Sequence, residues 1–194
     1  MRCFAVVVAV VSMSVATVIA QKQEMPKPGP EHQRLGAFVG NWTFEGELKP
    51  GPMGPGGKMT GTDRIEWAPG NFFVQRSYQG KSPNGEIQGL EILAYDGAKK
   101  IYTFNTFDFL GNLASGTMTV KGNTWTTTGT MTMGATTMRD RCSLEFGAGG
   151  LTLTMKCEIS TDGKTWTPTF DGRAKKTGQA TQAPGAPRRT PTGR

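Results

Sequence analysis

From residue 41 to residue 175 the chain alternates apolar and polar side chains. In the first such segment Trp42, Phe44 and Leu48 share one parity, and charged residues occupy the other. A period of two is typical of strands with one face in a core and one in solvent. The alternation predicts ten strands, near residues 41–49, 59–68, 71–80, 86–95, 99–110, 113–121, 123–133, 136–146, 151–160 and 165–175.

Short turns separate these segments. Pairs of residues that tolerate positive φ lie between them at Asn84-Gly85, Asp96-Gly97, Gly122-Asn123 and Asp162-Gly163. Two-residue hairpin turns need such residues. A turn at residues 122–123 would place Val120 opposite Trp125 and leave the even-numbered threonines from 124 to 132 on the wet face. The Pro- and Gly-rich residues 50–57 predict a long loop after the first strand.

A short helix precedes the strands. Leu35, Phe38 and Val39 recur at helical spacing within residues 31–39, and Gly40 ends the helix. A meander of many strands with nothing to cover it removes its edges by closing. The sequence therefore predicts an all-β fold, an antiparallel meander closed into a β-barrel of about ten strands with a short N-terminal helix. Barrels of this size can hold one small ligand.

The first twenty residues have the layout of a secretory signal peptide. An apolar run from Phe4 to Val11 follows Arg2, and small residues lead to Ala20 before a polar segment, so we expect cleavage after Ala20. A membrane anchor is the alternative, but the apolar run is shorter than the ~20 residues that a bilayer requires. The predicted organisation is a signal peptide over 1–20, a linker over 21–30, a barrel domain over 31–176 and a disordered basic tail over 177–194.

The formal charge of +7 is concentrated at the C-terminal end. Residues 21–172 hold equal numbers of basic and acidic residues, whereas residues 173–194 hold only basic ones. A protein that reads phosphates needs a basic stripe on its folded surface, so we expect no nucleic-acid partner. Contact of the tail with anionic lipid or cell-wall polymer stays open as an alternative to a solvated end.

Two cysteines remain after the predicted cleavage removes Cys3. A two-residue turn at Gly149-Gly150 would place Cys142 opposite Cys157. Directly opposed residues have Cα atoms ~4.5–5.5 Å apart, a span that a disulfide can bridge. A metal site at the two thiols would lack a nearby histidine or further thiol. The sequence therefore predicts a Cys142–Cys157 disulfide, no metal site, and a periplasmic or secreted location without stable membrane insertion.

A series of short motifs resembles a known family. The motifs are Gly40-x-Trp42, Glu45-Gly46-Glu47, Pro69-Gly70-Asn71-Phe72, Tyr78-x-Gly80, Tyr95-Asp96, Lys100-x-Tyr102 and Asp108. Gly-x-Trp after a short helix is similar to the opening of calycin barrels such as lipocalins, fatty-acid-binding proteins and nitrobindin-like proteins. The whole order, over about residues 33–175, resembles the secreted bacterial DUF1579 family. The resemblance implies a lipocalin-like barrel and carries no established reaction, ligand or catalytic residue.

Catalytic and cofactor motifs are sparse. Nitrobindin-like proteins hold haem through a histidine in the barrel, but the sole histidine here, His32, precedes the first strand and is expected at the surface. A Ser-His-Asp or Cys-His set is not expected, and no phosphate-binding loop is present. We therefore predict no cofactor and no catalytic residues. The alternative is an isomerase- or hydrolase-type enzyme that uses inward Asp63, Asp108, Arg76 and Tyr102.

Arg76 is the strongest candidate for a ligand-binding residue. Val74 and Tyr78 share its parity, so it is expected to point inward, where a guanidinium needs an anion. Asp63 or Asp108 could pair with it permanently, or it could bind the carboxylate of a ligand, as in fatty-acid-binding barrels. The candidate ligand-binding residues are Arg76, Tyr78, Tyr102, Phe104, Asp108, Trp42 and Trp125.

The predicted interior is rich in aromatic and methionine side chains. It comprises Trp42, Phe44, Trp67, Phe72, Tyr95, Tyr102, Phe104, Trp125, Met118, Met131, Met133 and Met155. A filled core and an apolar pocket have the same sequence pattern, so both stay open. The favoured function is a non-enzymatic barrel that binds a small apolar or amphipathic molecule. The alternatives are the enzyme above and an envelope interaction module with a solid core; oligomeric state is not predicted.

Overall fold

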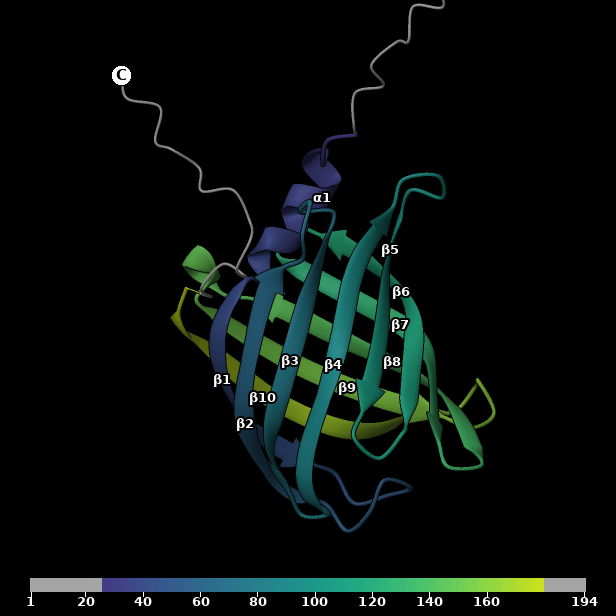
Figure 1. The fold of residues 1–194 in the computed structure, drawn as a ribbon. Coiled ribbons are helices and arrows are strands. Elements are labelled where there is room, and N and C mark those ends of the chain that lie inside the picture. Colours follow the sequence, from purple (N-terminus) through teal and green to yellow (C-terminus); the bar gives the residue numbers. More distant parts are fainter. Residues whose placement is uncertain (1–25, 180–194) are drawn as a thin grey trace, which may run out of the picture.

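The computed structural model describes residues 26–179, which form a single β-barrel (Figure 1). The predicted signal peptide, part of the linker and most of the tail lie outside the described residues. The helical segments are α1 (Pro30–Arg34), η1 (Leu35–Ala37) and η2 (Ala148–Gly150). The strands are β1 (Gly40–Leu48), β2 (Gly57–Trp67), β3 (Phe73–Ser82), β4 (Gly85–Asp96), β5 (Ile101–Asp108), β6 (Leu113–Lys121), β7 (Thr124–Met133), β8 (Thr136–Phe146), β9 (Thr152–Ser160) and β10 (Thr167–Gly178).

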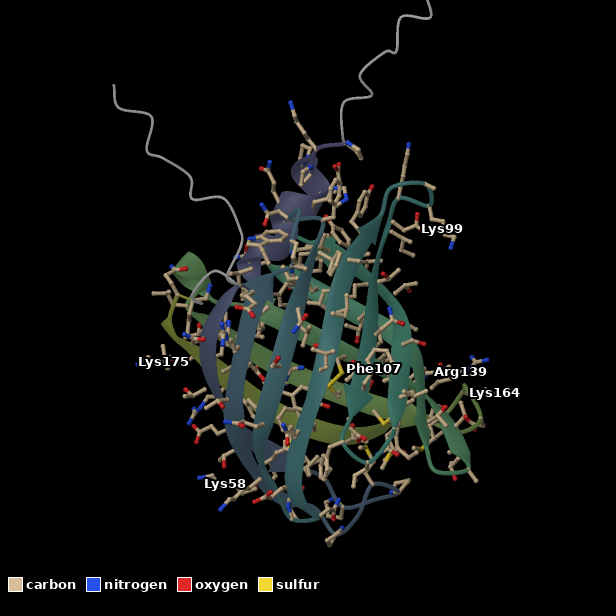
Figure 2. The ribbon with its side chains drawn as sticks, viewed as in Figure 1. Lys58, Lys99, Phe107, Arg139, Lys164 and Lys175 are labelled. Atoms are coloured by element: carbon tan, nitrogen blue, oxygen red, sulfur yellow. A yellow bond between two sulfur atoms is a disulfide. The ribbon has the colours of Figure 1, made fainter. Side chains whose placement is uncertain are left out.

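The barrel is closed by pairing between its first and last strands. Each strand pairs antiparallel with its neighbours in sequence, and β1 pairs with β10 from Asn41 to Leu48. The predicted all-β class and closed barrel are therefore confirmed. The register at the β6–β7 hairpin is also as predicted, with Val120 opposite Trp125. Figure 2 shows side chains on both faces of the wall, with Lys58 and Lys175 pointing away from the barrel.

Local hydrogen bonds move some boundaries from their predicted places. Ser82 pairs with Gly85, so the β3–β4 turn consists of Pro83 and Asn84 and lies one residue earlier than predicted. Strand β5 ends at Asp108, not near residue 110, because the Asp108 carboxylate accepts hydrogen bonds from the backbone N–H groups of Leu110 and Asn112. These bonds hold a turn where the sequence pattern predicts two more strand residues.

The short helical segment lies across one end of the barrel (Figure 1). Leu35 and Phe38 are buried there, and the Trp42 indole donates a hydrogen bond to the Phe38 carbonyl at 2.8 Å. The tyrosine hydroxyl of Tyr102 donates to the carbonyl of Glu31 at 3.0 Å. These contacts fix the helical segment on the barrel and close that end. No helix within residues 26–179 is long and apolar enough to cross a bilayer.

Most of the predicted interior residues lie in or against the core. Phe72, Met131 and Met133 do not belong to it. Met131 lines a cavity inside the barrel. Phe72 lies in the β2–β3 turn and packs its ring on His32 at a centroid distance of 5.2 Å, and Met133 is the last residue of β7. His32 is consequently half-buried at the closed end of the barrel and is not a fully exposed surface residue.

Inward glycines make room for aromatic rings. Gly116 and Gly129 lie opposite each other on β6 and β7, and the Phe104 ring covers both. A Cβ atom at Gly129 would collide with the Ser115 carbonyl oxygen and come within 2.8 Å of the Phe104 ring. The barrel wall therefore requires the absence of a side chain at this point.

Substitution of Gly129 tests this packing. We expect Gly129→Ala to lower the free energy of unfolding by about 2 kcal/mol, because the added methyl group overpacks the wall. Urea unfolding measures the change. Gly97→Ala is the matched control, since a Cβ atom at Gly97 would meet nothing within 4 Å, and it should stay within about 0.5 kcal/mol of wild type. Equal stabilities of the two variants would contradict the packing described.

The predicted disulfide is present on the inner wall of the barrel. Cys142 on β8 is the directly opposed partner of Cys157 on β9, with Cα atoms 4.1 Å apart. The bond therefore links two strands that already pair, across a separation of 15 residues.

Removal of this bond should destabilise the fold. We expect the double variant Cys142→Ala/Cys157→Ala to lose about 3 kcal/mol of unfolding free energy, because the unfolded chain gains the freedom of an open loop. Urea unfolding with and without reductant tests this. Reductant should bring the wild type to the level of the variant and leave the variant unchanged. A wild-type protein that is insensitive to complete reduction would show that the bond contributes nothing.

Candidate ligand-binding cavity

A cavity of about 390 Å³ lies inside the barrel. Its walls are mainly apolar and include Trp42, Phe44, Ile65, Phe104, Met118 and Met131. The inward side chains thus do not fill the interior, which decides between the two possibilities that the sequence left open. The volume is at the lower end of the roughly 300–1,000 Å³ range of small-molecule sites.

Arg76 points into this cavity between two carboxylates. Its guanidinium donates hydrogen bonds to Asp63 Oδ1 at 2.9 Å and to Glu91 Oε2 at 3.0 Å. Asp63, Arg76 and Glu91 lie on adjacent strands β2, β3 and β4, and Arg76 is directly opposite Glu91. The Thr106 hydroxyl donates to the second oxygen of Glu91 at 3.1 Å. Of the two predicted partners of Arg76, Asp63 accepts a hydrogen bond from it and Asp108 does not.

Burial and the neighbouring charges shift the pKa values of Arg76 and Asp63. Burial lowers the pKa of Arg76, but the attraction of Asp63 and Glu91 outweighs burial, so its pKa lies above the usual value. Burial raises the pKa of Asp63, and Arg76 offsets only part of that effect. The Tyr78 ring lies beside the guanidinium, with 4.8 Å between the Arg76 Cζ atom and the ring centroid. About a quarter of the Arg76 side chain (26 %) stays accessible.

A further carboxylate, Asp140 on β8, also lines the cavity. Only 7 % of this residue is exposed, and its Oδ1 atom has no hydrogen-bond partner within residues 26–179. The residues opposite Asp140 are Gly129 and Ile159, and neither offers a polar side chain. Burial, together with the charge of Glu91, raises the pKa of Asp140 to about 6.

Glu91 and Asp140 were not among the residues predicted from the sequence. The signal for Asp140 was its parity with Met138, Leu144 and Phe146, which places it on the apolar side of its strand. Glu91 shares the parity of Leu93 and Tyr95 on β4, but its pairing with Arg76 follows only from the correct position of the β3–β4 turn. Both residues belong to the cavity wall.

The seven candidate ligand-binding residues fall into two groups. Trp42, Arg76, Tyr78 and Phe104 line the cavity. Tyr102 and Trp125 are not among its lining residues; they are buried against each other with a centroid distance of 4.8 Å. Asp108 is taken up by the β5–β6 turn, where its second carboxylate oxygen accepts a hydrogen bond from the Asn112 side chain at 2.7 Å.

The proposed acid–base set does not come together on one cavity. Asp63 and Arg76 line it, whereas Tyr102 and Asp108 lie elsewhere. His32, the histidine that was compared with the haem ligand of nitrobindin-like proteins, is also not among the residues that line the cavity. No group of three or more histidine, cysteine, aspartate or glutamate residues in the described part of the chain could hold a metal ion.

Comparison with known proteins identifies the family. A family model described as "Protein of unknown function (DUF1579)" matches residues 27–175. The chain belongs to the DUF1579 family.

Solved structures align with this DUF1579 protein at low sequence identity. The crystal structure of Rv2717c from M. tuberculosis aligns with a TM-score of 0.54 and 13 % identity, over 77 % of this chain and 99 % of that chain. A de novo designed fluorescence-activating β-barrel aligns with a TM-score of 0.40 and 13 % identity, over 73 % of this chain and 95 % of that chain. No curated protein sequence matches. The similarity to Rv2717c concerns the fold alone.

The buried carboxylate should make the stability of the DUF1579 protein depend on pH. Folded Asp140 keeps its proton up to about pH 6, whereas the ordinary value is 3.8. The folded state therefore binds more protons between these values, and its stability decreases as the pH rises. In Asp140→Asn this loss is absent. We expect the unfolding free energy of the variant, relative to wild type, to increase by about 2 kcal/mol between pH 4 and pH 7.5.

Urea unfolding at the two pH values measures this difference. Asp171→Asn is the matched control, since Asp171 is exposed on β10, and its stability relative to wild type should be the same at both pH values. The assignment would be wrong if Asp140→Asn and the control gave the same result.

Proposed function

We propose that this protein binds a small, mainly apolar or amphipathic molecule inside its barrel. The observation that carries the proposal is the unfilled interior of about 390 Å³, walled by aromatic and methionine side chains with a few polar groups among them. Such walls are typical of small-molecule sites. Methionine side chains such as Met118, Met131 and Met155 can adjust to ligands of different shape.

The loop between β1 and β2 is the proposed entrance. The helical segment covers one end of the barrel, and Met53, in this loop, lines the cavity. The loop is held to the β3–β4 turn by a hydrogen bond from the Asn84 side chain to the Met53 carbonyl at 2.8 Å. Its glycine and proline residues allow it to move aside without breaking strand pairs.

We further propose that the protein acts outside the cytoplasm, in the periplasm or as a secreted protein. The disulfide between Cys142 and Cys157 supports this location, since disulfides persist in oxidising compartments and are rare in the cytosol. The signal-peptide pattern in residues 1–20 agrees with it.

A cavity-filling variant tests binding inside the barrel. Ala114 on β6 lines the cavity, whereas its neighbour Ser115 is exposed. We expect the neutral probe 1-naphthylmethanol to bind the wild type, and Ala114→Phe to weaken its affinity about tenfold or more, because the added ring occupies the ligand volume. Ser115→Phe adds the same ring to the outer face and should leave the affinity unchanged.

Isothermal titration calorimetry gives the affinities, and circular dichroism checks that both variants fold. Equal affinities for the two variants would place the probe outside the barrel. Absence of binding to the wild type would contradict the proposed function.

A further inference from the structure

The charges on the cavity wall are unbalanced. Arg76 is the one cation among the lining residues, and Asp63, Glu91 and Asp140 also line the cavity. A fourth carboxylate, Glu158, is bound by Arg141 at 2.7 Å. Apart from the Glu158–Arg141 pair, the wall with Asp140 ionised therefore carries more negative than positive charge. In an enclosed apolar site this excess opposes a bound anion and favours a cation.

Arg76 is poorly placed to bind a ligand carboxylate. Each of its two terminal nitrogens already donates to a protein carboxylate, at 2.9 Å and 3.0 Å. A ligand carboxylate would have to displace Asp63 or Glu91, and the displaced group would remain buried without a partner. Arg76 therefore positions the two acidic side chains and does not offer a free donor pair to a ligand carboxylate.

Asp140, unlike Arg76, is not paired with an oppositely charged side chain within residues 26–179. It projects from β8, which is five strands away from β3 in either direction around the barrel. In Figure 1, β3 and β4 form the near wall and β8 crosses behind them. No ion pair joins Arg76 to Asp140 within the described residues. Asp140 thus lines the cavity with a carboxylate whose buried Oδ1 atom has no donor among residues 26–179.

The space beside Asp140 can take a donor group, because Asp140 lines the unfilled cavity. The Phe104 ring lines the same cavity and fills the space over Gly129, directly opposite Asp140 on β7. A positively charged nitrogen at this position would meet a carboxylate and an aromatic ring together. Both interact favourably with an ammonium group.

We propose that the ligand is a small hydrophobic amine, whose protonated nitrogen donates a hydrogen bond to Asp140 while its apolar body lies against the aromatic and methionine walls. This inference rests on the proposed function and specifies the ligand class. It replaces the carboxylate ligand that the inward position of Arg76 indicated from sequence.

Three probes of matched shape test the proposal. They are 1-naphthylmethylamine, 1-naphthylmethanol and 1-naphthoate, which are cationic, neutral and anionic at pH 7.5. We expect the amine to bind about tenfold or more tightly than the alcohol, and the anion to bind most weakly, as measured by isothermal titration calorimetry. In Asp140→Asn the amine should lose about tenfold or more in affinity, while the alcohol changes less than about threefold. Asp171→Asn is the control and should alter neither.

The outcomes separate the anchor from the cavity. The proposed function stands if the alcohol binds the wild type and Ala114→Phe weakens its affinity. The amine proposal is nevertheless wrong if the amine binds no more tightly than the alcohol, or if Asp140→Asn leaves the affinity for the amine unchanged. The tightest binding by 1-naphthoate would also overturn the amine proposal. If none of the three probes binds, both proposals fail.

A pH series on the wild type avoids dependence on the folding of the variant. Since the pKa of Asp140 is about 6, amine affinity should fall about tenfold between pH 7.5 and pH 5, and alcohol affinity should not. The other charged or titratable groups that line the cavity are Asp63, Arg76, Tyr78, Glu91 and Glu158 with its partner Arg141. A flat pH profile for the amine would contradict a role for Asp140.

Discussion

The pairing of β1 with β10 is the constraint on which the other features of this protein depend. It turns one face of a ten-stranded meander into an interior and leaves no free edge. Side chains of one parity then point into a space whose width is set by the strand number. Because Gly61, Gly116 and Gly129 on the wall have no side chains, the rings of Phe44 and Phe104 can lie close to the strands. The result is a wall of large side chains around space that they do not fill.

Closure also decides how the polar groups of the interior behave. A guanidinium inside a barrel cannot reach solvent freely, so its anions must come from neighbouring strands. Asp63 and Glu91 supply them, one from each side of Arg76. Once these three groups have satisfied one another, the far wall is left with Asp140, which has only Gly129 and Ile159 opposite it. The proposed ligand chemistry therefore depends on Asp140, whose Oδ1 atom has no partner within residues 26–179, and not on Arg76.

Much of the fold could be predicted because it depends on local rules. Alternation located the strands. The sum rule paired Cys142 with Cys157 correctly, although the connection is a longer turn that contains η2 and not the predicted two-residue hairpin at Gly149-Gly150. The site depends on long-range register and is more sensitive to error. A turn at Asn84-Gly85 would pair Arg76 with Leu93, whereas the turn at Pro83-Asn84 pairs it with Glu91. Parity also cannot tell whether an inward side chain reaches a cavity or ends in a turn, as Asp108 does, or whether the interior is filled.

If the barrel interior is an accessible chamber with an acidic anchor, a ligand amine should be visible at Asp140. A crystal structure of the protein soaked with 1-naphthylmethylamine is the decisive measurement. We expect electron density for the naphthyl ring inside the barrel, with the amine nitrogen within hydrogen-bonding distance of the Asp140 carboxylate. A collapsed interior filled by Phe104 and the methionine side chains, or a probe bound only on the outer surface, would contradict it.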